Sequence, residues 1–279
     1  MTSKRLSKMI LCARMFYGVI VIWLVFLTAS VQADSYLQLG GSQESFHYKE
    51  FSNSGILLDR EDGNIPGVSA EIARDQEAYS GILNIGFAGS RVAYDGRTQG
   101  GRPLVTRTKE QMLDASAILS WPGKDNTWNP RLLTGVGFRK WARDIQATSA
   151  SNRLYERYQW FYWIVGFNFN MWQYKQWSVG FDWRLLRPIN PSIYVEYPGY
   201  DSEMLALGAE DSIRVSVPIS YQLNSKELIL IESYYQTWNL APSSSKRLYS
   251  GGSPTSLSIS EPESKTEVYG IQLSLRFKY

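Results

Sequence analysis

The chain has 279 residues, of which 29 are Lys or Arg, 26 are Asp or Glu, one is His and one is Cys. The formal net charge of +3 excludes a strongly basic nucleic-acid-binding protein, so no nucleic-acid partner is expected. Aromatic residues make up 14% of the chain while its mean hydropathy is −0.27, which favours alternating apolar and polar positions over long apolar runs.

The first 33 residues have the three parts of a secretory signal peptide. Residues 1–14 are basic, residues 15–29 are almost continuously apolar, and Val31 and Ala33 occupy the two positions that a signal peptidase reads. The sequence therefore predicts a signal peptide over 1–33. An uncleaved membrane anchor is the alternative, although the apolar run is shorter than the ~20 residues that a spanning helix needs.

The domain expected over 34–279 is nearly neutral. Four of the 29 basic residues lie in the leader, so 25 basic and 26 acidic residues remain. The single cysteine, Cys12, also lies in the leader, and the only histidine is His47, so no disulfide, metal centre or cofactor is expected. No later segment reaches ~18 consecutive apolar residues, so any membrane crossing must use strands.

Beyond Ala33 apolar residues recur at every second position, which is the period of a β-strand. In 158–171, for example, one face would carry Phe161, Trp163 and Val165. The alternation predicts ten strands: 36–49, 67–75, 78–95, 106–121, 131–143, 158–171, 176–187, 212–222, 226–239 and 269–279.

The last of these segments is the most regular. Its apolar face consists of Tyr269, Ile271, Leu273, Leu275, Phe277 and Tyr279. Six apolar residues in phase, ending with an aromatic residue at the C-terminus, resemble the C-terminal signature of bacterial outer-membrane β-barrels. This resemblance implies a multi-pass protein of a Gram-negative outer membrane. It also implies that the barrel-insertion machinery recognises these six residues and that the barrel contacts membrane lipid and lipopolysaccharide.

The predicted connections alternate between short and long. The long ones are 50–66, 96–105, 144–157, 188–211 and 240–265. Short periplasmic turns and long outer loops are typical of transmembrane barrels, in which strands must close because lipid offers no partner to a free edge. We therefore predict an all-β, antiparallel up-and-down transmembrane barrel of about ten strands. Counts of eight or twelve are also compatible with the pattern.

The two faces of the strands predict different surroundings. The lumen is expected to hold Glu71, Asp114, Arg139, Arg143, Asp182, Arg184, Arg214, Glu232, Arg276 and Lys278. Because both signs of charge are present, we predict that these groups pair into a plug, with a narrow channel for small solutes as the alternative. Interfacial aromatic girdles are expected to include Trp172, Trp177, Tyr221, Tyr235, Trp238, Phe277 and Tyr279.

Ten strands with long outer loops also resemble the omptins, outer-membrane surface proteases that depend on an Asp pair and an Asp–His pair at the rim of the barrel. This chain has only His47, and no Asp-X-His or Asp-X-Asp sequence accompanies it. His47 shares parity with Leu37 and Leu39, so it is expected to point away from the lumen as a solvated rim residue. No catalytic residue is assigned, and the omptin likeness is one of architecture.

These patterns favour a non-enzymatic structural or surface-interaction barrel that presents its loops, above all 188–211 and 240–265, at the cell surface. A porin-like narrow channel and a surface hydrolase of omptin-like architecture are the two alternatives. The sequence predicts no particular surface ligand.

Overall fold

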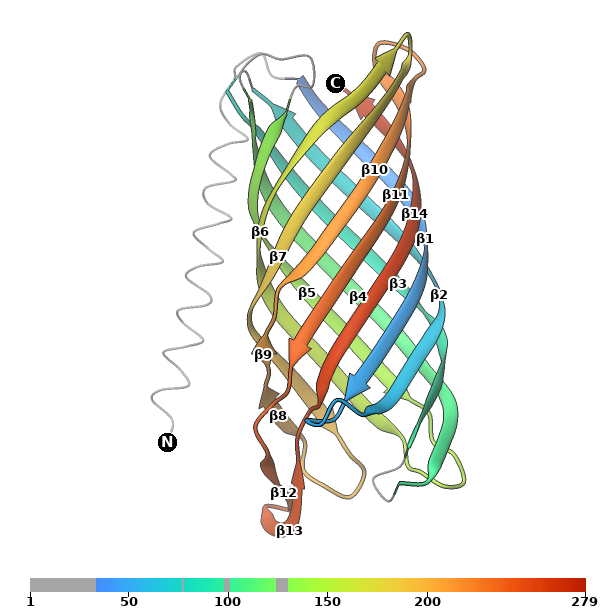
Figure 1. Ribbon diagram of the computed structural model, residues 1–279, viewed down its shortest axis with the longest axis vertical. Coiled ribbons are helices and arrows are strands. Elements are labelled where there is room, and N and C mark those ends of the chain that lie inside the picture. Colours follow the sequence, from blue (N-terminus) through green and yellow to red (C-terminus); the bar gives the residue numbers. More distant parts are fainter. Residues whose placement is uncertain (1–33, 77, 98–100, 124–129) are drawn as a thin grey trace. The chain divides into compact units, whose positions relative to one another are not determined.

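A computed structural model describes residues 34–76, 78–97, 101–123 and 130–279 (Figure 1). The signal peptide predicted over 1–33 lies outside the described residues. The long strands are β1 (Asp34–Phe51), β2 (Leu57–Asp75), β3 (Ser80–Arg97), β4 (Pro103–Pro122), β5 (Arg131–Ile145), β6 (Leu154–Tyr174), β7 (Trp177–Glu196), β10 (Ser212–Gln222), β11 (Glu227–Ala241) and β14 (Glu263–Lys278).

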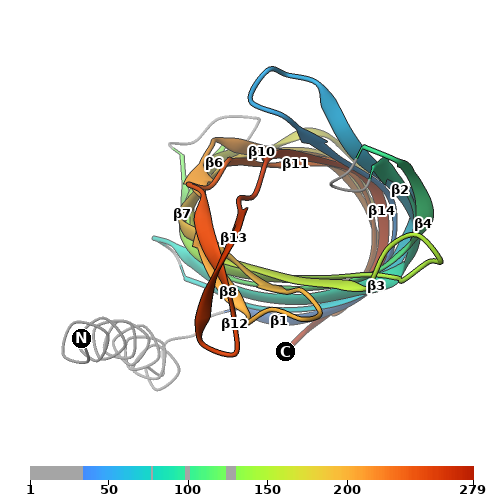
Figure 2. The same cartoon turned by 90° about the horizontal axis from the view of Figure 1, so that it is seen from below.

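Each long strand pairs antiparallel with its neighbours, and the last strand pairs with the first. The closing pair β14 and β1 runs in continuous register from Tyr36 opposite Lys278 to Phe51 opposite Glu263. The chain therefore forms a closed ten-stranded barrel, as the alternation predicts, and the end-on view shows this ring (Figure 2). Within the described residues no helix is long and apolar enough to cross a membrane.

Four short strands lie in the two longest loops at one end of the barrel (Figure 1). β8 (Glu203–Ala206) extends the sheet next to β7, and β9 (Gly208–Ala209) pairs with β11. β12 (Lys246–Ser250) and β13 (Ser253–Ile259) form a separate hairpin. These loops are thus built largely from paired strands, and we call this end of the barrel the loop end.

Side chains alternate between the inside and the outside of the barrel. On β6, Trp163 is 53% exposed whereas its inward neighbours Trp160 and Ile164 are each 2% exposed. The exposed apolar residues of the outer face include Leu37, Leu39, Val68, Ile72, Ile85, Phe87, Leu132, Phe161, Val165, Phe167, Ile219, Ile231, Ile271, Leu273 and Leu275. We call this set the apolar band, because such a face is suited to lipid rather than to water.

Towards the loop end the outer face becomes polar. Arg60, Asp62, Lys109, Lys140 and Arg187 point outwards there and are exposed. We call these five residues the polar collar. Since nine of the ten long strands have 15 to 21 residues, more than the ~9–11 that cross a membrane, the loop end of the barrel projects beyond the apolar band.

Two expectations from the sequence are wrong. Most of the loop predicted over 50–66 is strand, because β2 begins at Leu57. The apolar alternation stops there, since the inward residues Asp59 and Glu61 are acidic, yet the backbone pairing with β1 continues. Trp238 is not part of an interfacial girdle: it faces the lumen and is 2% exposed, in phase with Glu232 on β11.

Candidate functional site

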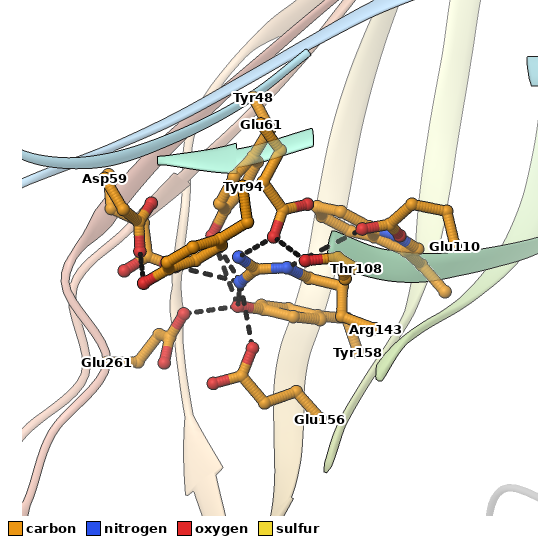
Figure 3. Close-up of polar contacts among 12 residues, drawn as sticks. Tyr48, Asp59, Glu61, Tyr94, Thr108, Glu110, Arg143, Glu156, Tyr158 and Glu261 are labelled. Atoms are coloured by element: carbon orange, nitrogen blue, oxygen red, sulfur yellow. Dashed lines mark hydrogen bonds and ion pairs between the residues drawn. The ribbon is translucent and has the colours of Figure 1, made fainter. Parts of the chain in front are cut away.

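Arg143 lies inside the barrel near its loop end. It is inward-facing on β5, two residues beyond Trp141, and its side chain is 1% exposed. The Nη1 nitrogen lies 2.8 Å from Glu50 Oε1 and 2.9 Å from Glu156 Oε2, and Nη2 donates to Glu61 Oε1 at 2.9 Å. Carboxylates on three other strands therefore converge on one guanidinium (Figure 3).

The surroundings of Arg143 contain more acidic groups than basic ones. We define the Arg143 cluster as Arg143 with Tyr48, Glu50, Asp59, Glu61, Tyr94, Thr108, Glu110, Glu156, Tyr158 and Glu261. Its acidic members are all at least nine-tenths buried. Burying this excess of carboxylates in their charged form would be very unfavourable, so their protonation decides whether the cluster is stable.

Two acidic members of the cluster are expected to hold their protons. Burial, followed by the charge of Glu61, raises the pKa of Glu110 well above its usual range. Burial, followed by the charge of Glu50, raises the pKa of Asp59. A buried carboxyl group that lies near a second carboxylate is favoured in its neutral form. We therefore assign protons to Glu110 and Asp59.

Burial also raises the pKa of two further acidic residues of the cluster. Burial raises the pKa of Glu156 to about 7, despite the opposing effect of Arg143. Burial and the charge of Glu156 raise the pKa of Glu261, which accepts a hydrogen bond from Tyr158 Oη. Glu261 belongs to the loop that precedes β14, so this contact ties the loop into the lumen. The cluster thus combines one permanent cation with acids that are partly neutralised by protons.

Aromatic rings fill the lumen next to the Arg143 cluster. This aromatic layer consists of Phe46, Tyr48, Trp141, Tyr158, Trp160, Tyr162 and Trp238. The hydroxyl oxygens of Tyr48 on β1 and Tyr158 on β6 are 3.3 Å apart, and these strands are opposite each other in the ring. Trp238 on β11 lies 5.3 Å from Trp160 and 5.0 Å from Tyr162, measured between ring centroids. Side chains from facing walls therefore meet across the barrel.

A polar cavity of about 180 Å³ lies in the lumen, on the other side of the aromatic layer from the cluster. Eight of the charged residues predicted for the lumen pair close to this cavity, namely Arg139 with Asp114, Arg184 with Asp182, Arg214 with Glu232 and Arg276 with Glu71. The N···O distances of these pairs are 3.3, 2.7, 2.9 and 3.8 Å in the same order. At ~30 Å³ per water, the cavity has room for about six water molecules.

The structure separates Arg143 from the other predicted lumen residues. Its partners are Glu50, Glu61 and Glu156, which the sequence pattern did not assign to the lumen. Lys278 is exposed at the end of β14 and is not among the described ion pairs. The sequence pattern could not assign Glu50 and Glu61 to the lumen, because both lie where the apolar alternation has ended. Only the register of β1 with β2 places them there.

The remaining predicted site residues lie on the outer face. All six apolar residues of the C-terminal segment are exposed, five of them on β14 and the last directly after it, namely Tyr269, Ile271, Leu273, Leu275, Phe277 and Tyr279. His47 also points out of the barrel, as its parity predicts. Within the described residues no group of three or more His, Cys, Asp or Glu side chains is arranged to hold a metal ion.

The fold is similar to that of the outer-membrane protease OmpT from Escherichia coli, with a TM-score of 0.58, 9% sequence identity, and coverage of 90% of this chain and 98% of that one. The translocator domain of the autotransporter NalP from Neisseria meningitidis aligns at a TM-score of 0.41 and 8% identity, covering 95% and 96% of the two chains. The β domain of the Bordetella autotransporter BrkA aligns at 0.44 and 8%, covering 88% and 99%.

No family model matches the sequence, and a search of curated proteins finds no significant match. At 9% identity the likeness to OmpT concerns the fold alone. The protein has the closed ten-stranded architecture of bacterial outer-membrane β-barrels.

Proposed function

We propose that the protein is an integral outer-membrane barrel whose lumen is closed to solutes and whose loop end forms a rigid surface for interactions outside the cell. The apolar band supports the membrane location, because a closed barrel with an apolar outer face satisfies its backbone in lipid. The basic members of the polar collar, such as Arg60 and Lys140, would meet the anionic groups of lipopolysaccharide.

The closed lumen is supported above all by the contact between Tyr48 and Tyr158 from opposite walls, with Arg143 beside them. Arg143 Nη1 lies 3.0 Å from Tyr48 Oη and 3.1 Å from Tyr158 Oη. A hydrated ion would have to pass between groups that already contact each other. This arrangement favours a plug over the narrow channel that the sequence leaves as an alternative.

The interaction surface is supported by contacts that hold the two longest loops together. Lys246 Nζ donates to Glu203 Oε2 at 2.7 Å, which joins the β12–β13 hairpin to β8. The carboxylate of Asp201 accepts hydrogen bonds from the backbone nitrogens of Gly251 and Gly252, at 3.0 and 2.8 Å. Loops held in this way lose little conformational entropy when a partner binds.

Conductance across a planar lipid bilayer tests the closed lumen. The wild-type protein is expected to give no conductance steps. A variant with Tyr158→Ala and Trp160→Ala is expected to leak ions, because it removes a ring that contacts Arg143 and a second ring from the aromatic layer. Phe161→Ala with Trp163→Ala, on the outer face of the same strand, is the matched control and should remain closed. Regular steps from the wild-type protein would support the channel instead.

A further inference from the structure

Three residues on the outer face of the barrel are connected by hydrogen bonds. Ser45 Oγ lies 3.1 Å from His47 Nε2, and His47 Nδ1 lies 2.6 Å from Asp62 Oδ1. The two ring nitrogens of one histidine thus bind a hydroxyl group on one side and a carboxylate on the other.

The sheet itself produces this arrangement. Ser45 and His47 are two residues apart on β1, so both point outwards, and Asp62 on β2 is the direct cross-strand partner of His47. The register of β1 with β2 is continuous from Asp34 to Glu50. The three side chains are therefore positioned on a rigid part of the barrel wall.

These contacts have the geometry of a serine nucleophile with its general base. Nε2 can accept the proton of Ser45 Oγ, while Asp62 fixes the tautomer that keeps the proton on Nδ1 and stabilises the imidazolium that forms. The side chains of His47 and Asp62 are 37% and 47% exposed, so a substrate can approach them from outside the barrel. The Arg143 cluster, by contrast, is buried.

Two side-chain amides flank the hydroxyl group. Asn64 on β2 is the cross-strand partner of Ser45, and Gln43 lies two residues before Ser45 on the same face of β1. Both residues line one hollow of the outer surface together with Ser45. A side-chain amide N–H beside the nucleophile is the type of donor that stabilises a developing oxyanion.

The site lies at the edge of the apolar band. Ser45 is in register with Tyr269 on β14, which in turn pairs with Tyr235 on β11. Two residues beyond Tyr269 along β14, on the side of the apolar band, Ile271 is exposed. On the other side, towards the loop end, the next outward pair is His47 with Glu267. Tyrosine rings at such a boundary are typical of the membrane–water interface. The serine therefore lies at the level where lipid chains join their polar head groups.

The neighbouring surface is suited to an acyl chain. The hollow of about 590 Å³ that contains Ser45 is lined by Val215, Val217, Tyr235, Tyr269 and Ile271. This lining continues into the apolar band, so a chain lying in it would remain among lipid tails while its ester group reached the serine.

We propose that Ser45, His47 and Asp62 form a hydrolase site that cleaves fatty-acyl esters of outer-leaflet lipids. Ser45 Oγ attacks the ester carbonyl carbon and transfers its proton to His47 Nε2. The tetrahedral intermediate then expels the lipid alkoxide, which takes that proton and leaves as an alcohol. His47 then deprotonates a water molecule, which attacks the acyl-serine. The second tetrahedral intermediate breaks its bond to Ser45 Oγ and releases the fatty acid, while His47 returns the proton to Ser45 Oγ.

Fatty-acyl esters of this kind occur in glycerophospholipids and in lipopolysaccharide. The assay therefore uses the full barrel in detergent micelles with two separate substrates, a diacyl phosphatidylcholine and purified lipopolysaccharide. Released fatty acid is measured by mass spectrometry. Release from only one of the substrates identifies the source of the ester, and release from both also supports the proposal.

Substitutions assign the activity to this site. Ser45→Ala and His47→Ala are expected to lower the rate of fatty-acid release about 10³-fold or more, and Asp62→Asn to lower it substantially. Ser54→Ala, in the exposed turn between β1 and β2, is the matched control and should keep the full rate. A fluorophosphonate probe should label Ser45 in the wild-type protein, and the labelled peptide is identified by mass spectrometry.

The heat-dependent gel mobility of each variant shows that its barrel is folded. Absence of fatty-acid release from both lipids by the folded wild-type protein overturns the proposal, whether or not the probe reacts. Release that survives Ser45→Ala overturns it as well. Both results are independent of the lumen, because conductance is measured separately and the hydrolase site lies outside the barrel.

Discussion

Glu61 and Glu110 both lie against the guanidinium of Arg143, at 2.9 Å from Nη2 and 4.0 Å from Nε respectively, and both residues are fully buried. Thr108 Oγ1 donates to Glu61 at 2.7 Å, and Trp141 Nε1 donates to Glu110. Arg143 provides the only guanidinium that contacts Glu61 in the described structure. The loop end of the barrel is thus stabilised by protons as well as by ion pairs, which makes its stability dependent on pH.

The barrel should become less stable as the pH rises from about 5 to about 8. The pKa of Glu156 is raised to about 7 in the fold from an ordinary 4.5, so between these values the folded state binds more protons than the unfolded chain. The stabilisation is therefore complete below about pH 4.5 and is lost as the pH rises through 7. The measurement is the temperature at which the protein loses its folded gel mobility. An unchanged or higher temperature at pH 8 would contradict this role of the cluster.

Glu110→Gln should reduce this pH dependence. An uncharged amide of nearly the same shape takes the place of the protonated acid and has no carboxyl proton to lose, so the variant is expected to fold and to lose less stability between pH 5 and pH 8. The same gel measurement applies. Glu196→Gln, at an exposed position at the loop end of β7, is the control and should retain the pH dependence of the wild type. Equal slopes for the Glu110 variant and the wild type would argue against a protonated Glu110.

Arg143→Met should destabilise the loop end strongly. Removing one partner from a buried ion pair leaves uncompensated charge and typically costs about 3–5 kcal/mol. Arg153→Met is the comparison, because Arg153 pairs with Asp144 on the outside of the barrel and its side chain is 61% exposed; little change is expected there. Hydrogen exchange should reveal faster opening at the loop ends of β1 and β6 in the Arg143 variant only. Equal protection in the two variants would count against the plug.

The alternation of apolar and polar residues at odd and even positions was sufficient to predict the strands and which residues share a face. Alternation placed Phe161, Trp163 and Val165 on one face without knowledge of any partner strand, and the structure exposes that face while Trp160, of the opposite parity, is buried. The girdle prediction for Trp238 was wrong because it relied on an aromatic side chain near a strand end and not on parity, which places Trp238 inside with Glu232. Composition along the strand does not distinguish a lipid interface from a filled lumen.

Both candidate sites needed strand register, which the sequence pattern did not supply. Glu61 and Asp62 lie in a segment predicted to be a loop, yet in the barrel Glu61 faces Arg143 and Asp62 faces His47 on opposite sides of the same wall. Ser45 could be considered as a nucleophile only once the structure showed Asp62 beside His47. Long-range pairing of this kind depends on the length of the turn between β1 and β2, which lies outside the apolar pattern.

Leu273→Arg should impair insertion of the barrel into the membrane. Leu273 is 58% exposed in the middle of the apolar face of β14, opposite Ile231 on β11. A cation on the lipid face near the bilayer centre costs about 2–4 kcal/mol, so the folded, membrane-extracted fraction is expected to fall. Leu273→Ala keeps the site uncharged and separates the effect of charge from that of lost side-chain volume. Gln272→Ala, beside it but lining the polar cavity, should insert normally. A wild-type yield of folded Leu273→Arg protein would mean that this face of β14 does not contact lipid.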